Sequence, residues 1–209
     1  MIENLHLVFT YPEGIPSEFI EEDISQLKDN DLNLYVTRQE NSIYAGFEWI
    51  VPTFFATYIL KPYFESFLQE AGKDHYKLLK DTCKKMLTKG KVTDVKIITP
   101  EQSFQKRSVN YNESIAVSIL FQMKTERRIK MLFNSNLDLQ DWENALDEFS
   151  DIILEHYQNY PNDRLSYEIK DLSPKPHYVI YVKINPITKE LEFHDDITLS
   201  LETRNSNQK

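Results

Sequence analysis

The stretch FEWIVPTFFATYILKPYFESFL, residues 47–68, decides the fold because it is the most apolar and aromatic run in the chain. Its uncharged part, residues 49–60, is too short to cross a membrane as a helix, since crossing takes about 20 apolar residues. Pro52 and Pro62 both suit the first turn of a helix, where a missing N–H costs nothing. We therefore expect a short helix from about Pro52 and a longer one from about Pro62, both packed in the core of a folded domain.

The predicted longer helix, residues 62–90, is amphipathic. Apolar residues recur at three- and four-residue spacing and include Cys83, while lysines occupy the opposite face. Gly90 follows the last apolar position and is expected to end the helix in a left-handed cap. The stripe places Cys83 inward, so we expect a buried and unreactive thiol.

The rest of the chain predicts alternating groups of strands and helices. Ser17 can cap a helix that lies between strands at 5–11 and 32–38, and Asp138 can cap a second helix that runs to about residue 157. The alternating stretch SIAVSILFQM forms a hairpin with 128–133, and 178–184 forms another with 191–193. Further strands are expected at 92–99 and 165–169. The pattern predicts an α+β fold, a mostly antiparallel sheet with amphipathic helices packed on it.

The length of 209 residues favours a single domain, residues 1–202, with a subdivision near residue 90 as the alternative and a flexible C-terminal tail at 203–209. Only four glycines are present, and no glycine-rich nucleotide loop occurs among them. The single cysteine, Cys83, cannot form an internal disulfide or a thiolate zinc site, and the first residues do not form a secretory signal. These features predict a cytoplasmic protein, and the composition suggests an AT-rich, bacterial or phage, genome.

Charge is segregated along the chain. Residues 1–72 carry a net charge of −9, residues 73–131 carry +8, and residues 132–209 carry −8. The acidic helix 138–155 has seven acids and no basic residue, which suits the docking of a basic partner. The basic middle segment either attracts an anion or faces the acidic flanks of the same chain or of a second copy.

The function predicted first is a non-enzymatic cytoplasmic interaction or accessory module that docks a protein partner or self-associates, including as a homodimer. Its surfaces would be aromatic and charge-segregated. The candidate partner-binding residues come from the aromatic run and from the acidic helix: Trp49, Phe54, Phe55, Asp141, Asp147 and Glu148.

Two alternatives rest on surface chemistry. An anion or nucleic-acid binding protein would use the basic segment 73–131, through Lys84, Lys85, Lys89, Lys91, Arg107, Arg127 and Arg128. The acidic pI of about 5.1 argues against a duplex-binding protein, because such domains are usually basic overall. A peripheral membrane protein would insert residues 47–68 at the lipid interface.

The last alternative is a metal-dependent hydrolase built on His194, Asp195 and Asp196, where an imidazole and two carboxylates come close together in sequence. Hydrolase elbows, phosphate-binding loops and dinucleotide fingerprints are absent from the sequence. We therefore assign no catalytic residue and expect no cofactor.

Overall fold

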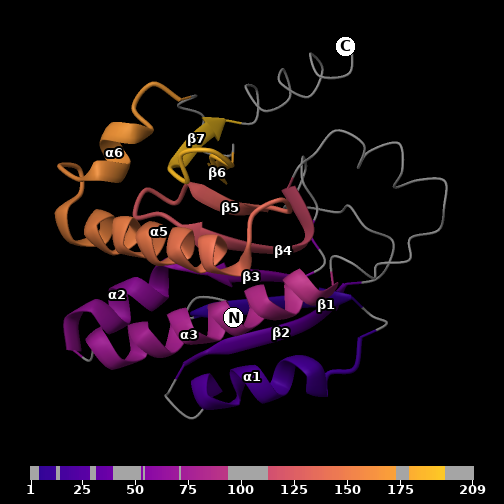
Figure 1. The fold of residues 1–209 in the computed structure, drawn as a ribbon. Coiled ribbons are helices and arrows are strands. Elements are labelled where there is room, and N and C mark those ends of the chain that lie inside the picture. Colours follow the sequence, from indigo (N-terminus) through magenta and orange to yellow (C-terminus); the bar gives the residue numbers. More distant parts are fainter. Residues whose placement is uncertain are drawn as a thin grey trace.

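The computed structural model describes residues 5–12, 15–28, 32–39, 53, 55–70, 72–93, 113–172 and 179–195 (Figure 1). Their elements follow one another along the chain in the order β1 (Leu7–Pro12), α1 (Glu18–Lys28), β2 (Leu34–Gln39), β3 (Phe55–Ile59), α2 (Lys61–Glu70), α3 (Gly72–Thr93), β4 (Glu113–Gln122), β5 (Arg128–Asn134), α5 (Leu139–Asn159), α6 (Arg164–Glu168), β6 (Ile180–Ile184) and β7 (Leu191–Asp195). The predicted tail, residues 203–209, lies outside the described residues.

The described strands form one seven-stranded sheet in the order β2-β1-β3-β4-β5-β6-β7. The pairs β1–β2, β3–β4 and β5–β6 are parallel, whereas β1–β3, β4–β5 and β6–β7 are antiparallel. The sheet is therefore mixed, and the prediction of a mostly antiparallel sheet is wrong. The reason is that helices connect the strands within each parallel pair, and a helical crossover returns the chain in its original direction.

The first difference from the predicted fold lies within residues 47–68. The helix expected from about Pro52 is instead β3, which lies between β1 and β4 and is buried along most of its length. A strand buried on both faces reads as a continuous apolar run, which periodicity alone does not distinguish from a short helix. The helix expected over residues 62–90 is confirmed only at its start, because α2 begins at Lys61. The structure has two helices there, since α2 ends at Glu70 and α3 runs from Gly72 to Thr93.

Predictions of local structure are also wrong at residues 165–169 and at Gly90, and the strand expected at 92–99 is described only at its start. Residues 165–169 were expected to form a strand, but Asp163 caps the helix α6 there by accepting from the Ser166 amide. Of the strand expected at 92–99, Val92 and Thr93 belong instead to α3, and residues 94–99 lie outside the described residues. Gly90 is not a helix cap; it lies within α3, and a Cβ on it would come within 2.6 Å of Val117. The glycine is needed for the close approach of helix and sheet.

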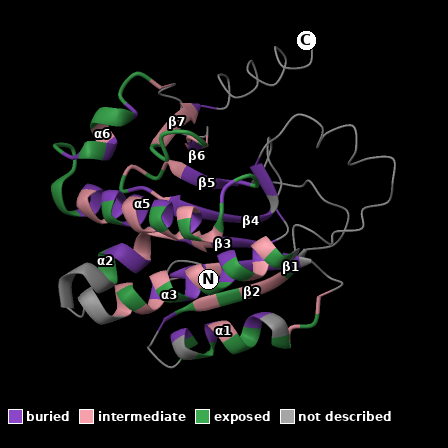
Figure 2. Ribbon diagram, viewed as in Figure 1, coloured by how far each residue is buried: buried purple, intermediate pink, exposed green. Residues whose placement is uncertain are grey.

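Helices α1, α3 and α5 cover one face of the sheet, and the core lies between them and the strands (Figures 1 and 2). The side chains of Phe121, Phe149 and Trp142 are almost wholly buried there. Both predicted hairpins are confirmed, as is the cap of α5, where Asp138 Oδ1 accepts from the Asp141 amide at 2.8 Å.

Cys83 is buried in this core, as predicted. Burial raises the pKa of its thiol to about 12, because the charged thiolate is poorly solvated there. The thiol is therefore neutral and shielded at ordinary pH, as expected of an unreactive core cysteine. Among the described helices, none is long and apolar enough to span a bilayer.

Candidate interaction surface

Strand β2 forms one edge of the sheet, next to β1. It pairs with β1 alone among the described strands, so its other side is open there. Tyr35, near its start, is 55% exposed, whereas Leu34 and Val36 are partly buried and pack against the core. Figure 2 shows this contrast between β2 and the buried central strands. An open edge of this kind is a template for pairing with another strand.

The backbone geometry identifies which groups of β2 point outward. The carbonyl of Asn33 accepts hydrogen bonds from the amides of His6, at 2.9 Å, and Leu7, at 3.2 Å, so it faces β1. Backbone groups of successive strand residues point to alternate sides. The amides and carbonyls of Leu34 and Val36 therefore point away from β1, while those of Tyr35 and Thr37 point toward it.

Helix α1 lies beside this edge and has three distinct faces. Ile20, Ile24 and Leu27 are buried, and Asp23 forms an ion pair with Lys89 of α3 at 2.5 Å. At 100° per residue, Glu21 and Lys28 fall on the flank opposite Asp23, away from α3. Both are exposed. Within the described residues, the β2 edge thus carries an apolar and aromatic strand beside a helix flank with one acid and one base.

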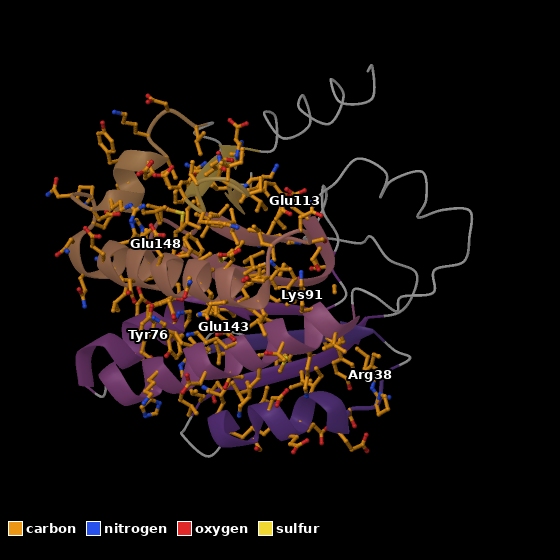
Figure 3. The ribbon with its side chains drawn as sticks, in the orientation of Figure 1. Arg38, Tyr76, Lys91, Glu113, Glu143 and Glu148 are labelled. Atoms are coloured by element: carbon orange, nitrogen blue, oxygen red, sulfur yellow. The ribbon has the colours of Figure 1, made fainter. Side chains whose placement is uncertain are left out.

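Arg38 lies near the end of β2, close to the start of α1 (Figure 3). Its Nε donates to the Tyr11 hydroxyl at 2.9 Å, and its guanidinium lies 5.9 Å from the centre of the same ring. The remaining residues of β2 are uncharged and include no proline or glycine. The strand therefore has few of the features that usually protect an edge from pairing.

The six residues predicted to bind a partner do not gather on one surface within the described part of the chain. Trp49 and Phe54 lie outside the described residues, and Phe55 is 3% exposed, in the core. The three acids lie on α5 and form intramolecular ion pairs: Asp141 with Lys189 at 2.8 Å, Asp147 with Lys84 at 2.6 Å, and Glu148 with Arg164 at 2.8 Å.

The acidic helix α5 lies against the basic helix α3. Asp147 accepts from Lys84 and also lies 3.2 Å from Lys80, which contacts Asp151 at the same distance. Burial acts to raise the pKa of Asp147, but hydrogen bonds from Lys84 and Lys80 outweigh it and hold the pKa below its usual value. Part of the basic middle segment is therefore paired with the acidic helix of the same chain and does not face a separate partner there.

This pairing predicts a loss of stability in acid. A carboxylate whose pKa is lowered by folding stabilises the folded state above its unfolded pKa, near 3.8, and the contribution is lost as the pH falls through the folded pKa. Because water partly screens this carboxylate, replacing Asp147 with asparagine should remove about 0.5–1 kcal/mol at pH 6, and little at pH 2.5. Urea unfolding of both proteins at pH 6 and pH 2.5 measures the change in the free energy of unfolding. An equal change at the two pH values would contradict the prediction.

The residues predicted to bind an anion are placed separately. Lys84 and Lys89 form the ion pairs given above, and Lys91 donates to the carbonyls of Ser135 and Leu137 at 2.8 Å and 2.7 Å (Figure 3). Lys85 is exposed on α3, Arg127 and Arg128 are partly buried at the start of β5, and Arg107 lies outside the described residues. Anion binding remains a prediction.

The aromatic run proposed for membrane contact is largely internal where it is described. Phe55, Ile59, Tyr63 and Phe64 are all at most 3% exposed. Phe64 stacks on Tyr157 with ring centres 4.3 Å apart. Residues 47–52 lie outside the described residues.

The predicted metal ligands lie at the end of β7. Neighbouring strand residues point to opposite faces of a sheet, so His194 and Asp195 are not directed at one ion. His194 Nε2 lies 3.7 Å from Glu192, and Asp196 lies outside the described residues. Within the described part of the chain, no three ligand-type side chains are grouped around a potential metal position.

Sequence reasoning missed a buried acid–base pair. His156 Nδ1 lies 3.0 Å from Asp163 Oδ1, and both side chains are inaccessible to solvent. Burial acts to raise the pKa of Asp163, but hydrogen bonds from Ser166 and His156 lower it overall. The imidazole packs edge-on to Tyr160 with ring centres 5.2 Å apart. The pair ties α6 to α5, and the His-x6-Asp spacing alone does not reveal it.

No family model, curated protein or solved structure matches the chain. The edge was also missed from sequence: LYVTRQ predicts a strand, but strand order depends on which strands pair, and a single sequence does not record that.

Proposed function

We propose that the chain is a non-enzymatic interaction module that docks a polypeptide strand along the open edge of β2. The observation that carries the proposal is the exposure of Tyr35 on an edge strand whose Leu34 and Val36 backbone groups point outward. Strand addition would give those groups hydrogen-bond partners and would cover the tyrosine. Main-chain bonds supply affinity in such a site, and the neighbouring side chains supply selectivity.

The edge is favoured over the acidic face of α5 as the docking surface. Asp141, Asp147 and Glu148 already pair with basic side chains of the same molecule. A basic partner would have to displace those pairs, which reduces its net gain. By contrast, Tyr35 and the outward backbone groups of β2 gain contacts without breaking any described ion pair.

Binding is favoured over catalysis by the placement of the most reactive groups. His156 and Asp163 are buried among tyrosine rings, and Cys83 is a neutral core thiol. The free thiol also fits a reducing setting, so we propose a cytoplasmic accessory protein. A bacterial source stays a prediction from composition.

The proposal is tested by capture with the full-length chain as bait. The bait is exposed to host extract and to a differently tagged copy of itself. Tyr35→Glu is compared with Tyr167→Glu, a matched control on α6 where the tyrosine is 68% exposed. We expect a stoichiometric polypeptide partner, including a second copy, that is lost with Tyr35→Glu and kept with Tyr167→Glu.

The captured partner is then purified, and binding is repeated with the two purified proteins. Equal binding by both tyrosine variants would contradict docking at β2. A chain that binds no polypeptide in either mixture would contradict the function as an interaction module.

A further inference from the structure

We propose that the occupant of the β2 edge is a second copy of this chain, paired antiparallel about a two-fold axis that passes beside Val36. The inference rests on the proposed function and names its partner. Two such copies would join their sheets into one continuous sheet, with the helices of both copies on the same face. Three features of the described edge favour this partner: its backbone pattern, its side-chain pairs and the charges on α1.

The backbone pattern fixes the register. Opposite residues of an antiparallel pair point their side chains to the same face, and a two-fold axis perpendicular to the sheet preserves the faces. Centring on Val36 places Val36 of one copy opposite Val36 of the other, and Leu34 opposite Arg38. Because the backbone groups of Val36 point away from β1, the central Val36 pair has the geometry for two hydrogen bonds. The Arg38 carbonyl already accepts from the Thr37 hydroxyl at 3.4 Å, so the register rests on the central pair.

The side chains suit this register. On the helix-covered face, the partly buried Leu34 and Val36 would extend the apolar core across the axis. On the other face, Tyr35 would lie opposite Thr37, a pairing of an aromatic and a β-branched residue that favours sheet formation. Arg38 of each copy would lie at the outer end of the ladder, far from its own symmetry mate.

Helix α1 supplies the charge complementarity. It runs antiparallel to β2 (Figure 1). The two-fold axis would therefore place the α1 helices of the two copies side by side in opposite directions. Glu21 of each copy would then face Lys28 of the other. Among the described residues, neither side chain forms an ion pair within its own copy. A segment of another protein that carried charges of a single sign would be repelled by either Glu21 or Lys28 on this flank.

The spacing of the elements allows the contact. Strands in a sheet lie about 4.8 Å apart, so a helix centred over β1 and β2 would lie about 5 Å from the axis. The two α1 helices would then be about 10 Å apart, within reach of normal helix packing, which is about 8–10 Å between axes. The same arrangement brings side chains on the facing flanks into ion-pair range.

Sedimentation equilibrium of the full-length chain over a concentration series tests the inference. We expect a monomer–dimer equilibrium for the unmodified chain. Lys28→Glu and Glu21→Lys should each raise the dissociation constant about tenfold or more, because two opposite-charge contacts per dimer become like-charge contacts. Glu22→Lys, an exposed position away from the flank, is the matched control and should change it little.

Mixing the two charge-reversal variants gives the sharpest result. In a mixed dimer of the Glu21→Lys and Lys28→Glu chains, the new lysine at position 21 of one chain faces the new glutamate at position 28 of the other. One of the two facing pairs then joins the two substituted side chains with their charges exchanged, and the other joins the two unmodified ones. Both pairs are opposite in charge, so the heterodimer should form more tightly than either homodimer.

Val36→Pro provides an independent test of the strand pairing. The amide of Val36 points away from β1, so the change should abolish dimerisation and leave the fold intact. Circular dichroism checks that each variant is folded. A folded Val36→Pro chain that dimerises as tightly as the unmodified chain would place the contact away from β2.

A dimer that loosens with Val36→Pro and re-forms as the mixed heterodimer supports the inference. If these substitutions leave the dissociation constant of the dimer unchanged, the interface lies elsewhere and the inference is overturned. A chain that stays monomeric also overturns it, but if such a chain still captures another protein through Tyr35, the proposed function stands. Loss of both dimerisation and capture removes both proposals.

Discussion

Replacing Trp142 with alanine is expected to lower the free energy of unfolding by about 4 kcal/mol, the largest effect of any substitution considered. The indole is fully buried, and its ring packs on Phe133 with centres 5.2 Å apart. Its Nε1 donates to the carbonyl of Asn134 at 2.9 Å, and Lys91 Nζ lies 4.4 Å from the ring centre. Alanine would leave a cavity and remove both polar contacts where α3, β5 and α5 meet.

Urea unfolding followed by circular dichroism measures the loss. Trp142→Phe is the matched control, because it keeps an aromatic ring and removes only the N–H and part of the volume. We expect it to cost about half as much as alanine. A loss below about 1 kcal/mol for Trp142→Ala would mean that this side chain does not hold the helices to the sheet.

Replacing Gly90 with alanine is expected to destabilise the protein by about 2 kcal/mol, although helix propensity alone predicts the opposite sign. A free helix position gains about 1 kcal/mol from glycine to alanine. At Gly90 the new Cβ would come within 2.6 Å of both Cβ and Cγ1 of Val117, which is 1% exposed. Because those atoms belong to the buried strand β4, α3 would have to move away from the sheet.

The sign of the change distinguishes the two effects. Lys85→Ala, on the exposed side of α3, is the control and should change the unfolding free energy by less than about 0.5 kcal/mol. Thermal unfolding of the three proteins under one set of conditions is sufficient. A Gly90→Ala protein more stable than the unmodified chain would show that α3 and β4 are not in close contact at this point.

Local patterns in the sequence predicted the amphipathic elements best. Asp138 marks the start of α5, and the alternation in SIAVSILFQM identifies β4, because capping and side-chain period are local properties. The inward position of Cys83 on α3 followed from the same spacing. Each of these features depends on residues that are close together along the chain.

The features that failed depend on contacts between distant residues. Phe55–Ile59 was expected to be helical because Pro52 and an apolar run satisfy either structure, and only its place between β1 and β4 makes it a strand. Gly90 has the same local signature as a helix cap, and only Val117 across the interface explains it as a packing position. The mixed sheet follows from such pairings.

The candidate surface was less predictable than the fold. Charge segregation suggested the acidic helix as the docking face, but Lys80 and Lys84 of α3 neutralise part of it. Tyr35 does not stand out in the sequence, because nothing in LYVTRQ shows that β2 is an edge strand. The exposure of Tyr35 depends on the position of β2 at the edge of the sheet, which is set by the pairing of distant strands.

Residue-resolved amide hydrogen exchange across a concentration series tests the role of the β2 edge most directly. The amides of Tyr35 and Thr37 face β1 and should be protected at every concentration. Those of Leu34 and Val36 face outward and should exchange quickly in dilute solution and become protected as the concentration rises. Fast exchange at Leu34 and Val36 at all concentrations, with no partner that slows it, would contradict strand addition at β2.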